Sequence, residues 1–264
     1  MKILNFLFSR SKQEQDKPIR DKLKTRKDFE RVLAEDLDIM ETTKARMDTA
    51  KNINLYMYRS LSYSYILILQ SKYSVDAKID ELRDIYIKSM HYFLQAFNKR
   101  NPIYADILNY VSLGVLLNIP DNNFRQLIDY VKQMDKQAKP SGWTPDLLLW
   151  FMLNSRMKEQ EKQKYAETLA YPRLYNGLYK AIQAPNAAAA KDALNKYLDR
   201  WYNLNSDAPW YNSHLKNNCY RGYWAWEVAA VAKIMHIDDS DLKNNQYYPY
   251  DMVHWADNET TAKE

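Results

Sequence analysis

One apolar block, from Gly222 to Met235, constrains the fold of this chain more than any other feature. It reads GYWAWEVAAVAKIM, and hydrophobic residues lie on all sides of the helix that this spacing predicts. A helix that is apolar all round must be buried among other helices. Glu227 is the only charge between Arg221 and Lys233, and a buried carboxylate must accept hydrogen bonds or bind a proton. The block therefore predicts a helical core with one acid inside it.

A second motif, Tyr247-Tyr248-Pro249-Tyr250-Asp251, follows this block. Pro249 has no N–H group and disfavours a helical conformation at the residue before it, so we expect the motif to be extended. Glu227 then has two possible roles. In the first it is a buried anchor, bonded to these tyrosines and to an indole, that fixes the motif on the helix. In the second it is the acid or base of an enzyme. The first is favoured, because no second catalytic group is evident.

The number and positions of the glycines and prolines favour helices over sheets. There are only four glycines among 264 residues, and nine prolines occur at intervals. Sheets with tight turns need glycine, whereas prolines at boundaries are typical of helical proteins. We therefore predict an all-α fold, an irregular multi-helix bundle in two packed helical subdomains. No fixed repeat length supports a regular solenoid.

Several helix boundaries can be read from capping residues. Ser74 is predicted to cap a helix that continues to residue 100, and Thr144 to cap one that opens with Pro145 and Asp146. Pro172 is predicted to start another helix.

A polar run at residues 132–142, ending in Pro-Ser-Gly, is the best candidate linker. We therefore divide the chain into a basic flexible tail (1–17), an N-terminal helical domain (18–137) and a C-terminal helical domain (138–264) that carries both motifs.

The two motifs together resemble the C-terminal signature of the PoNi-type bacterial immunity proteins. The residues that carry the resemblance are Gly222, Tyr223, Trp224, Trp226, Glu227, Tyr247, Tyr248, Pro249, Tyr250 and Asp251. Residues 20–23 (RDKL) and 71–74 (SKYS) are similar to the separate N-terminal domain of that family. The resemblance implies an immunity protein that acts in bacterial competition through type VI secretion. Such a protein binds a PoNe-type DNase toxin and occludes its active site, with no enzymatic turnover, metal or cofactor.

Charge is distributed unevenly along the chain. Residues 1–27 hold nine basic and three acidic residues (+6), and residues 236–264 hold seven acidic and two basic residues (−5). Either end can be a solvated surface, but an acidic surface also suits a basic nuclease. The candidate toxin-binding residues are therefore Asp238, Asp239, Asp241, Asp251 and Asp257. A helical nucleic-acid-binding protein that uses the basic N-terminus is the alternative.

The remaining features limit the other classes of function. The four glycines are too far apart to form a phosphate-binding loop. His236 lies near three aspartates, but a helix end with capping acids explains this spacing better than a metal site does. The single cysteine, Cys219, favours a reducing, cytoplasmic location, and we expect no signal peptide or membrane span. Direct nucleic-acid binding is not expected under the immunity interpretation, and a homodimer is left open.

Overall fold

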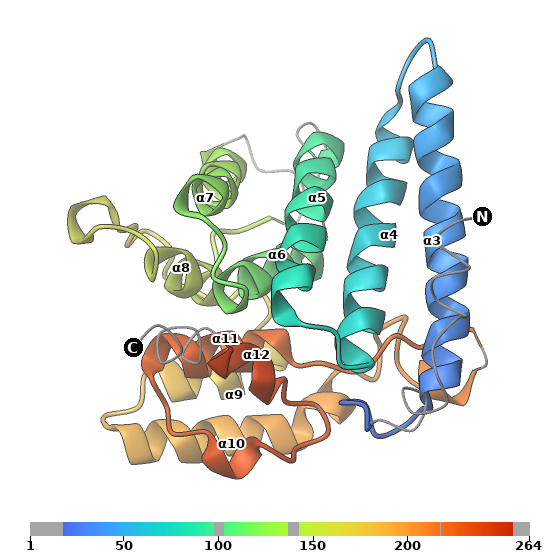
Figure 1. Ribbon diagram of the computed structural model, residues 1–264. Coiled ribbons are helices and arrows are strands. Elements are labelled where there is room, and N and C mark those ends of the chain that lie inside the picture. Colours follow the sequence, from blue (N-terminus) through green and yellow to red (C-terminus); the bar gives the residue numbers. More distant parts are fainter. Residues whose placement is uncertain (1–17, 98–102, 137–142, 217, 256–264) are drawn as a thin grey trace, which may run out of the picture. The chain divides into compact units, whose positions relative to one another are not determined.

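Figure 1 shows the computed structural model, which describes residues 18–97, 103–136, 143–216 and 218–255. Within these ranges the regular secondary structure consists of helices and contains no strand. The all-α prediction is therefore confirmed. The chain divides into two compact units: the first unit comprises residues 1–99 and 212–223, and the second unit comprises residues 100–211 and 224–264.

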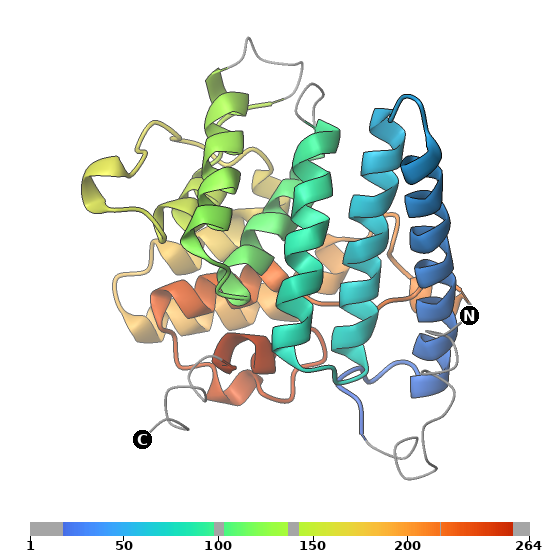
Figure 2. The ribbon, with the colours of Figure 1, turned by 45° about the horizontal axis from the view of Figure 1, so that its top comes forward.

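The first unit is built on three long helices, α3 (Arg26–Thr49), α4 (Leu55–Ser74) and α5 (Ile79–Phe97). Figures 1 and 2 show α4 lying between α3 and α5. Side-chain caps start the first two of these helices. Thr25 and Asp28 form a capping box at α3, and the Asn54 side chain accepts a hydrogen bond from the Met57 N–H at α4.

A distant segment completes the first unit. Residues 212–223, here called the strap, include the short 3-10 turn Ser213–Leu215. Arg221 of the strap donates two hydrogen bonds to Asp36 of α3, at 2.8 and 2.7 Å, and both side chains are buried. Tyr220 donates its hydroxyl hydrogen bond to Asp21. A segment nearly 200 residues away in sequence therefore supplies polar partners to the start of the unit.

Ser74 has a different role from the predicted one. It ends α4 instead of capping α5, and its hydroxyl donates a 2.8 Å hydrogen bond to the carbonyl oxygen of Arg221. The predicted cap was wrong because the hydroxyl group has a buried acceptor on the strap, which sequence spacing alone does not show.

The second unit gathers the remaining helices around α11. These are α6 (Tyr104–Leu116), α7 (Asp121–Lys136), α8 (Leu147–Asn154), α9 (Pro172–Ile182), α10 (Ala187–Leu204), α11 (Trp226–Met235) and α12 (Tyr250–His254). Helix α11 packs against α6, α8, α9, α10 and α12. Its first seven residues are all buried, as expected for a helix that is apolar all round. Short 3-10 turns occur at Glu159–Glu161 and Ser240–Leu242.

The second unit corrects one further boundary and confirms another. The N-cap of α8 is Asp146 instead of Thr144, because the Asp146 carboxylate accepts a 2.7 Å hydrogen bond from the Leu149 N–H. Pro172 occupies the first turn of α9, as predicted. Gly177 of α9 lies against the ring of Tyr197 on α10, so a Cβ atom at position 177 would lie 2.8 Å from the ring.

Both signature motifs differ in part from their predicted conformations. Helix α11 begins at Trp226, because Gly222 has a φ angle of 108° and the Ala225 N–H donates a 2.9 Å hydrogen bond to the Tyr247 carbonyl oxygen. The last two residues of the tyrosine motif are not extended, because α12 starts at Tyr250. The hydrogen bond from the Ala225 N–H to the Tyr247 carbonyl oxygen nevertheless joins the two motifs directly.

The compact units do not divide where the predicted domains do. The sequence boundary between residues 137 and 138 lies within the second unit, which begins at residue 100. Helix α7 belongs to that unit, and residues 137–142 lie outside the described residues. The predicted tail at residues 1–17 also lies outside them.

Candidate functional site

The acidic residues predicted to bind a partner fall into different environments. Asp239 is only 3% exposed and accepts hydrogen bonds from the Tyr248 hydroxyl at 2.6 Å and the His254 Nε2 at 2.8 Å. It therefore holds the tyrosine motif and α12 together and is removed from solvent. Its prediction as a contact residue needs correction, because a buried carboxylate with two partners is an anchor.

Asp238 and Asp241 are exposed, but both share one cation. The Lys191 Nζ atom of α10 lies 3.1 Å from a carboxylate oxygen of each. Hydrogen bonds from Ser240, and then the pairing with Lys191, lower the pKa of Asp238 to about 2. The hydrogen bond from Lys191 also lowers the pKa of Asp241. Lys191 therefore offsets part of the negative charge that the sequence places here.

The other two candidate residues do not extend this cluster of acids. Asp251 is exposed on α12, and Asp257 lies outside the described residues. The structure thus brings Asp238 and Asp241 together on Lys191, and leaves two exposed carboxylates next to a cation instead of an uninterrupted acidic surface.

Glu227 is buried in α11, as expected, and its bond to an indole is confirmed. The Trp201 Nε1 atom of α10 donates a 2.6 Å hydrogen bond to Glu227 Oε1. Burial raises the pKa of this carboxyl to about 7, and the bond from Trp201 lowers it only in part. Tyr248, one of the three motif tyrosines expected as partners of Glu227, bonds Asp239 instead. Glu227 thus anchors α11 to α10, and Asp239 anchors the tyrosine motif.

The charge of Glu227 acts on three buried tyrosines. Burial raises the pKa of Tyr175 and of Tyr197, and the charge of Glu227 adds to this in both. For Tyr104 burial raises the pKa first, and the nearby Asp146 carboxylate, to which it donates a 2.8 Å hydrogen bond, adds to the effect. The Tyr197 hydroxyl has no hydrogen-bond partner among the described residues. Neutral tyrosines and a carboxyl that holds a proton readily suit a buried core better than an open catalytic centre.

Stacked aromatic rings link the signature to α10. Tyr247 stacks on Tyr202 with ring centroids 5.5 Å apart, and Tyr202 stacks on Tyr211 at 4.5 Å. Trp201, which holds Glu227, stacks on Trp210 at 5.4 Å. These ring contacts give the tyrosines here a packing role.

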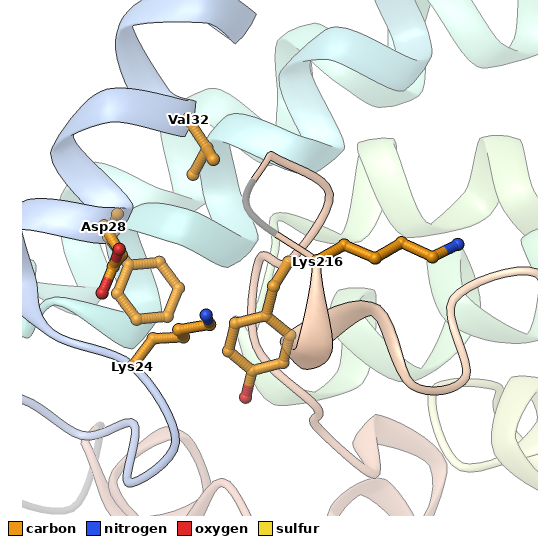
Figure 3. Close-up of a pocket in the computed structure, with 6 residues that line it drawn as sticks. Lys24, Asp28, Val32 and Lys216 are labelled. Atoms are coloured by element: carbon orange, nitrogen blue, oxygen red, sulfur yellow. The ribbon is translucent and has the colours of Figure 1, made fainter.

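A small pocket in the first unit marks where the strap meets α3. Figure 3 shows Lys24, Asp28 and Val32 on one side, and Lys216 extending away from them. The rings of Phe29 and Tyr220 also line it, with centroids 5.7 Å apart. It has room for about one water molecule, so it is a packing gap at the strap and not a ligand site.

Two buried charged residues that join the strap to α3 were missed by sequence reasoning. Arg221 and Asp36 form a buried ion pair, yet neither was singled out. A signal existed, because Asp36 falls on the face of its helix that carries Val32 and Leu33. Charge on an apolar face indicates either a site or a buried partner.

The described residues offer neither a metal site nor a membrane span. No group of three or more His, Cys, Asp or Glu side chains among them is placed to hold a metal ion. None of the helices in the described ranges is long and apolar enough to cross a bilayer. The fold and its polar clusters define an all-α protein in which buried carboxylates join helices and segments.

Comparison with protein families then identifies the chain more closely. The model for PoNe immunity protein (PoNi), N-terminal, matches residues 11–129, and the model for PoNe immunity proteins (PoNi), C-terminal, matches residues 144–252. The chain belongs to the PoNi family of immunity proteins, because the two models together cover most of it.

Structural comparison agrees with this fold. The crystal structure of protein PA2201 from Pseudomonas aeruginosa is similar, with a TM-score of 0.71 and 18% sequence identity, covering 97% of this chain and 95% of that chain. At this level of identity the likeness concerns the fold alone. No curated protein matched the chain.

Proposed function

We propose that this protein binds its cognate PoNe DNase toxin and neutralises it by covering the nuclease active surface. Membership of a family of PoNe immunity proteins is the observation that carries the proposal. Inhibition then requires a tight protein complex and no turnover, and a specific complex of this kind buries roughly 1,600 Å². In this proposal the immunity protein acts in the cytoplasm, where the toxin meets DNA. The toxin is either delivered by a neighbouring cell through type VI secretion or made by the cell itself.

The acidic end of the second unit contributes to this complex in our proposal. Asp238, Asp241 and Asp251 are exposed, so they can face a basic nuclease. Complementary charge mainly accelerates association and selects partners. Asp239 is not among the proposed contacts, because its carboxylate already holds Tyr248 and His254.

The test is co-expression with the PoNe toxin encoded next to this protein, followed by co-purification. We expect cells to survive and the two proteins to elute together. The purified toxin should lose its DNase activity at a one-to-one ratio of the two proteins. Toxin that stays fully active in a large excess of this protein would refute the proposal.

The same assay addresses the two alternatives. A Glu227→Gln variant that still folds but no longer protects, in the absence of any complex, would indicate an enzyme. Loss of salt-sensitive DNA binding on removal of residues 1–17, together with loss of protection, would indicate a nucleic-acid-binding protein.

A further inference from the structure

Exposed apolar side chains gather on the hairpin formed by α3 and α4. Of the eight large hydrophobic side chains exposed in the described part of the chain, four lie on this hairpin or at its turn. They are Ile39 (51% exposed), Ile53 (44%), Tyr56 (76%) and Tyr63 (64%). Apolar residues scattered singly on a surface need no explanation, but a concentration of them marks an interaction site.

Helix α4 carries this apolar character along its solvent face. Tyr56, Arg59 and Tyr63 are all exposed and lie on one stripe, at positions i, i+3 and i+7. The 20-residue helix holds only two charged residues, Arg59 and Lys72. A solvent-facing helix surface usually carries many charges. Tyrosine and arginine are also the residues that dominate the energy of protein interfaces.

The neighbouring helix α3 adds negative charge. Between Val32 and Thr43 it has four acidic residues and no basic one. Asp36 is used internally by Arg221, whereas the exposed carboxylates of Glu35, Asp38 and Glu41 form no ion pair with any residue that the structure describes.

The apolar and acidic residues lie on two neighbouring helices and at the turn between them. Figures 1 and 2 show α3 and α4 side by side, and Glu41 and Tyr63 lie equally far along their helices from the connecting turn. Ile39 lies within the acidic stretch itself. The hairpin therefore combines apolar anchors with unpaired carboxylates, unlike the C-terminal acids that share Lys191.

We propose that this hairpin surface, comprising Glu35, Asp38, Ile39, Glu41, Tyr56 and Tyr63, is the docking site for the basic surface of the DNase toxin. The inference rests on the proposed function and goes beyond it by adding a docking surface in the first unit to the C-terminal acids of the second unit. A DNase must present basic residues to DNA phosphates, and three unpaired carboxylates complement them. The partner then buries the tyrosine rings and Ile39, and this burial of apolar surface slows dissociation of the complex.

The anchors are tested by a Tyr56→Ala/Tyr63→Ala variant and the purified toxin in surface plasmon resonance. Both side chains are exposed, so we expect an unchanged circular dichroism spectrum and melting temperature. Affinity should fall about 100-fold, mainly through faster dissociation. The control is Tyr171→Ala, an exposed tyrosine of the second unit, which should bind like the wild type.

The carboxylates are tested separately by kinetics at two salt concentrations. The variant Glu35→Gln/Asp38→Asn/Glu41→Gln should associate roughly 10-fold more slowly at low salt, and the difference should vanish at about 0.5 M salt because charges are then screened. A control with the same change in charge, at exposed acids elsewhere, should associate like the wild type; it replaces Asp84, Asp129 and Glu167.

The outcomes separate the two proposals. If the wild type binds the toxin and both hairpin variants bind equally well, the hairpin surface is wrong and the proposed function stands. If the wild type binds no toxin, the proposed function fails and the hairpin inference falls with it. If the tyrosine variant changes only the oligomeric state, measured by light scattering, the surface joins two copies of this chain and the inference is overturned.

Discussion

At the scale of single residues, Glu227 shows how one buried acid can stabilise a contact and still reduce stability. Its carboxylate accepts the Trp201 indole hydrogen bond, yet burial raises its pKa to about 7 from the usual 4.5. Below pH 4.5 it is protonated in both states. Between pH 4.5 and 7 it stays protonated when folded but ionises when unfolded, so its contribution to stability falls as pH rises. Above pH 7 that loss is complete.

Replacing Glu227 with Gln should therefore stabilise the protein at pH 8. The Gln carbonyl can still accept the Trp201 hydrogen bond, and it removes an ionisation cost of about 3 kcal/mol. We expect urea denaturation to give the variant a larger free energy of unfolding at pH 8 and the same free energy near pH 4.5. A difference that does not change with pH would show that no proton is bound at Glu227.

Gly177 makes a second residue-scale prediction, based on contact distance. An Ala methyl group would lie 2.8 Å from the Tyr197 ring, which is buried. We expect Gly177→Ala to lower the free energy of unfolding by about 1–3 kcal/mol, despite the better helix propensity of Ala. Thermal denaturation measures this effect. The double variant Gly177→Ala/Tyr197→Leu should lose less than the sum of the two single changes, and strict additivity would argue against the clash.

At the scale of elements, the strap depends on its ion pair. Arg221 and Asp36 are both buried, and removal of one partner leaves an isolated charge. Arg221→Met should therefore lower the free energy of unfolding by about 3–5 kcal/mol in chemical denaturation. The double variant Arg221→Met/Asp36→Leu should recover much of this loss, because two apolar side chains leave no buried charge. A double variant as unstable as the single one would contradict this account.

Sequence patterns predicted elements well where one local rule decided them. Helix α9 starts at Pro172 as expected, because a proline in the first turn needs no partner in another helix. The start of α11 was placed too early. Gly222 has a positive φ angle, and the Ala225 N–H bonds Tyr247, which follows later in the chain, so neither residue is helical. Ser74 looks like a capping residue, but its hydroxyl bonds the Arg221 carbonyl oxygen, 147 residues further along the chain. Such long-range pairings leave no periodic signal in the sequence.

At the scale of the whole molecule, the family's two halves differ from the two compact units. The N-terminal family model ends at residue 129 and the C-terminal model begins at residue 144, yet the strap at 212–223 belongs to the first unit. The first unit therefore depends on a segment from the C-terminal half of the chain. Glu227 and Asp239, in contrast, find their partners within the second unit.

A fragment of residues 1–99 should consequently fold poorly by itself. It retains Asp36 and Asp21 but lacks Arg221 and Tyr220, so two buried carboxylates lose their side-chain partners. A peptide of residues 212–223 added in trans should raise its melting temperature, whereas the same peptide with Met in place of Arg221 should not. A fragment that melts cooperatively and ignores the peptide would show that the strap is dispensable.

The strap also restricts how such proteins can be recombined. Consider a hybrid that joins the N-terminal half of one relative to the C-terminal half of another. It inherits the carboxylates at positions 21 and 36 from one parent, and their tyrosine and arginine partners from the other. Crossovers between the two halves should yield viable hybrids only when both parents have matching partners at these positions. New toxin specificity would therefore arise more readily by exchanging exposed side chains than by shuffling whole halves.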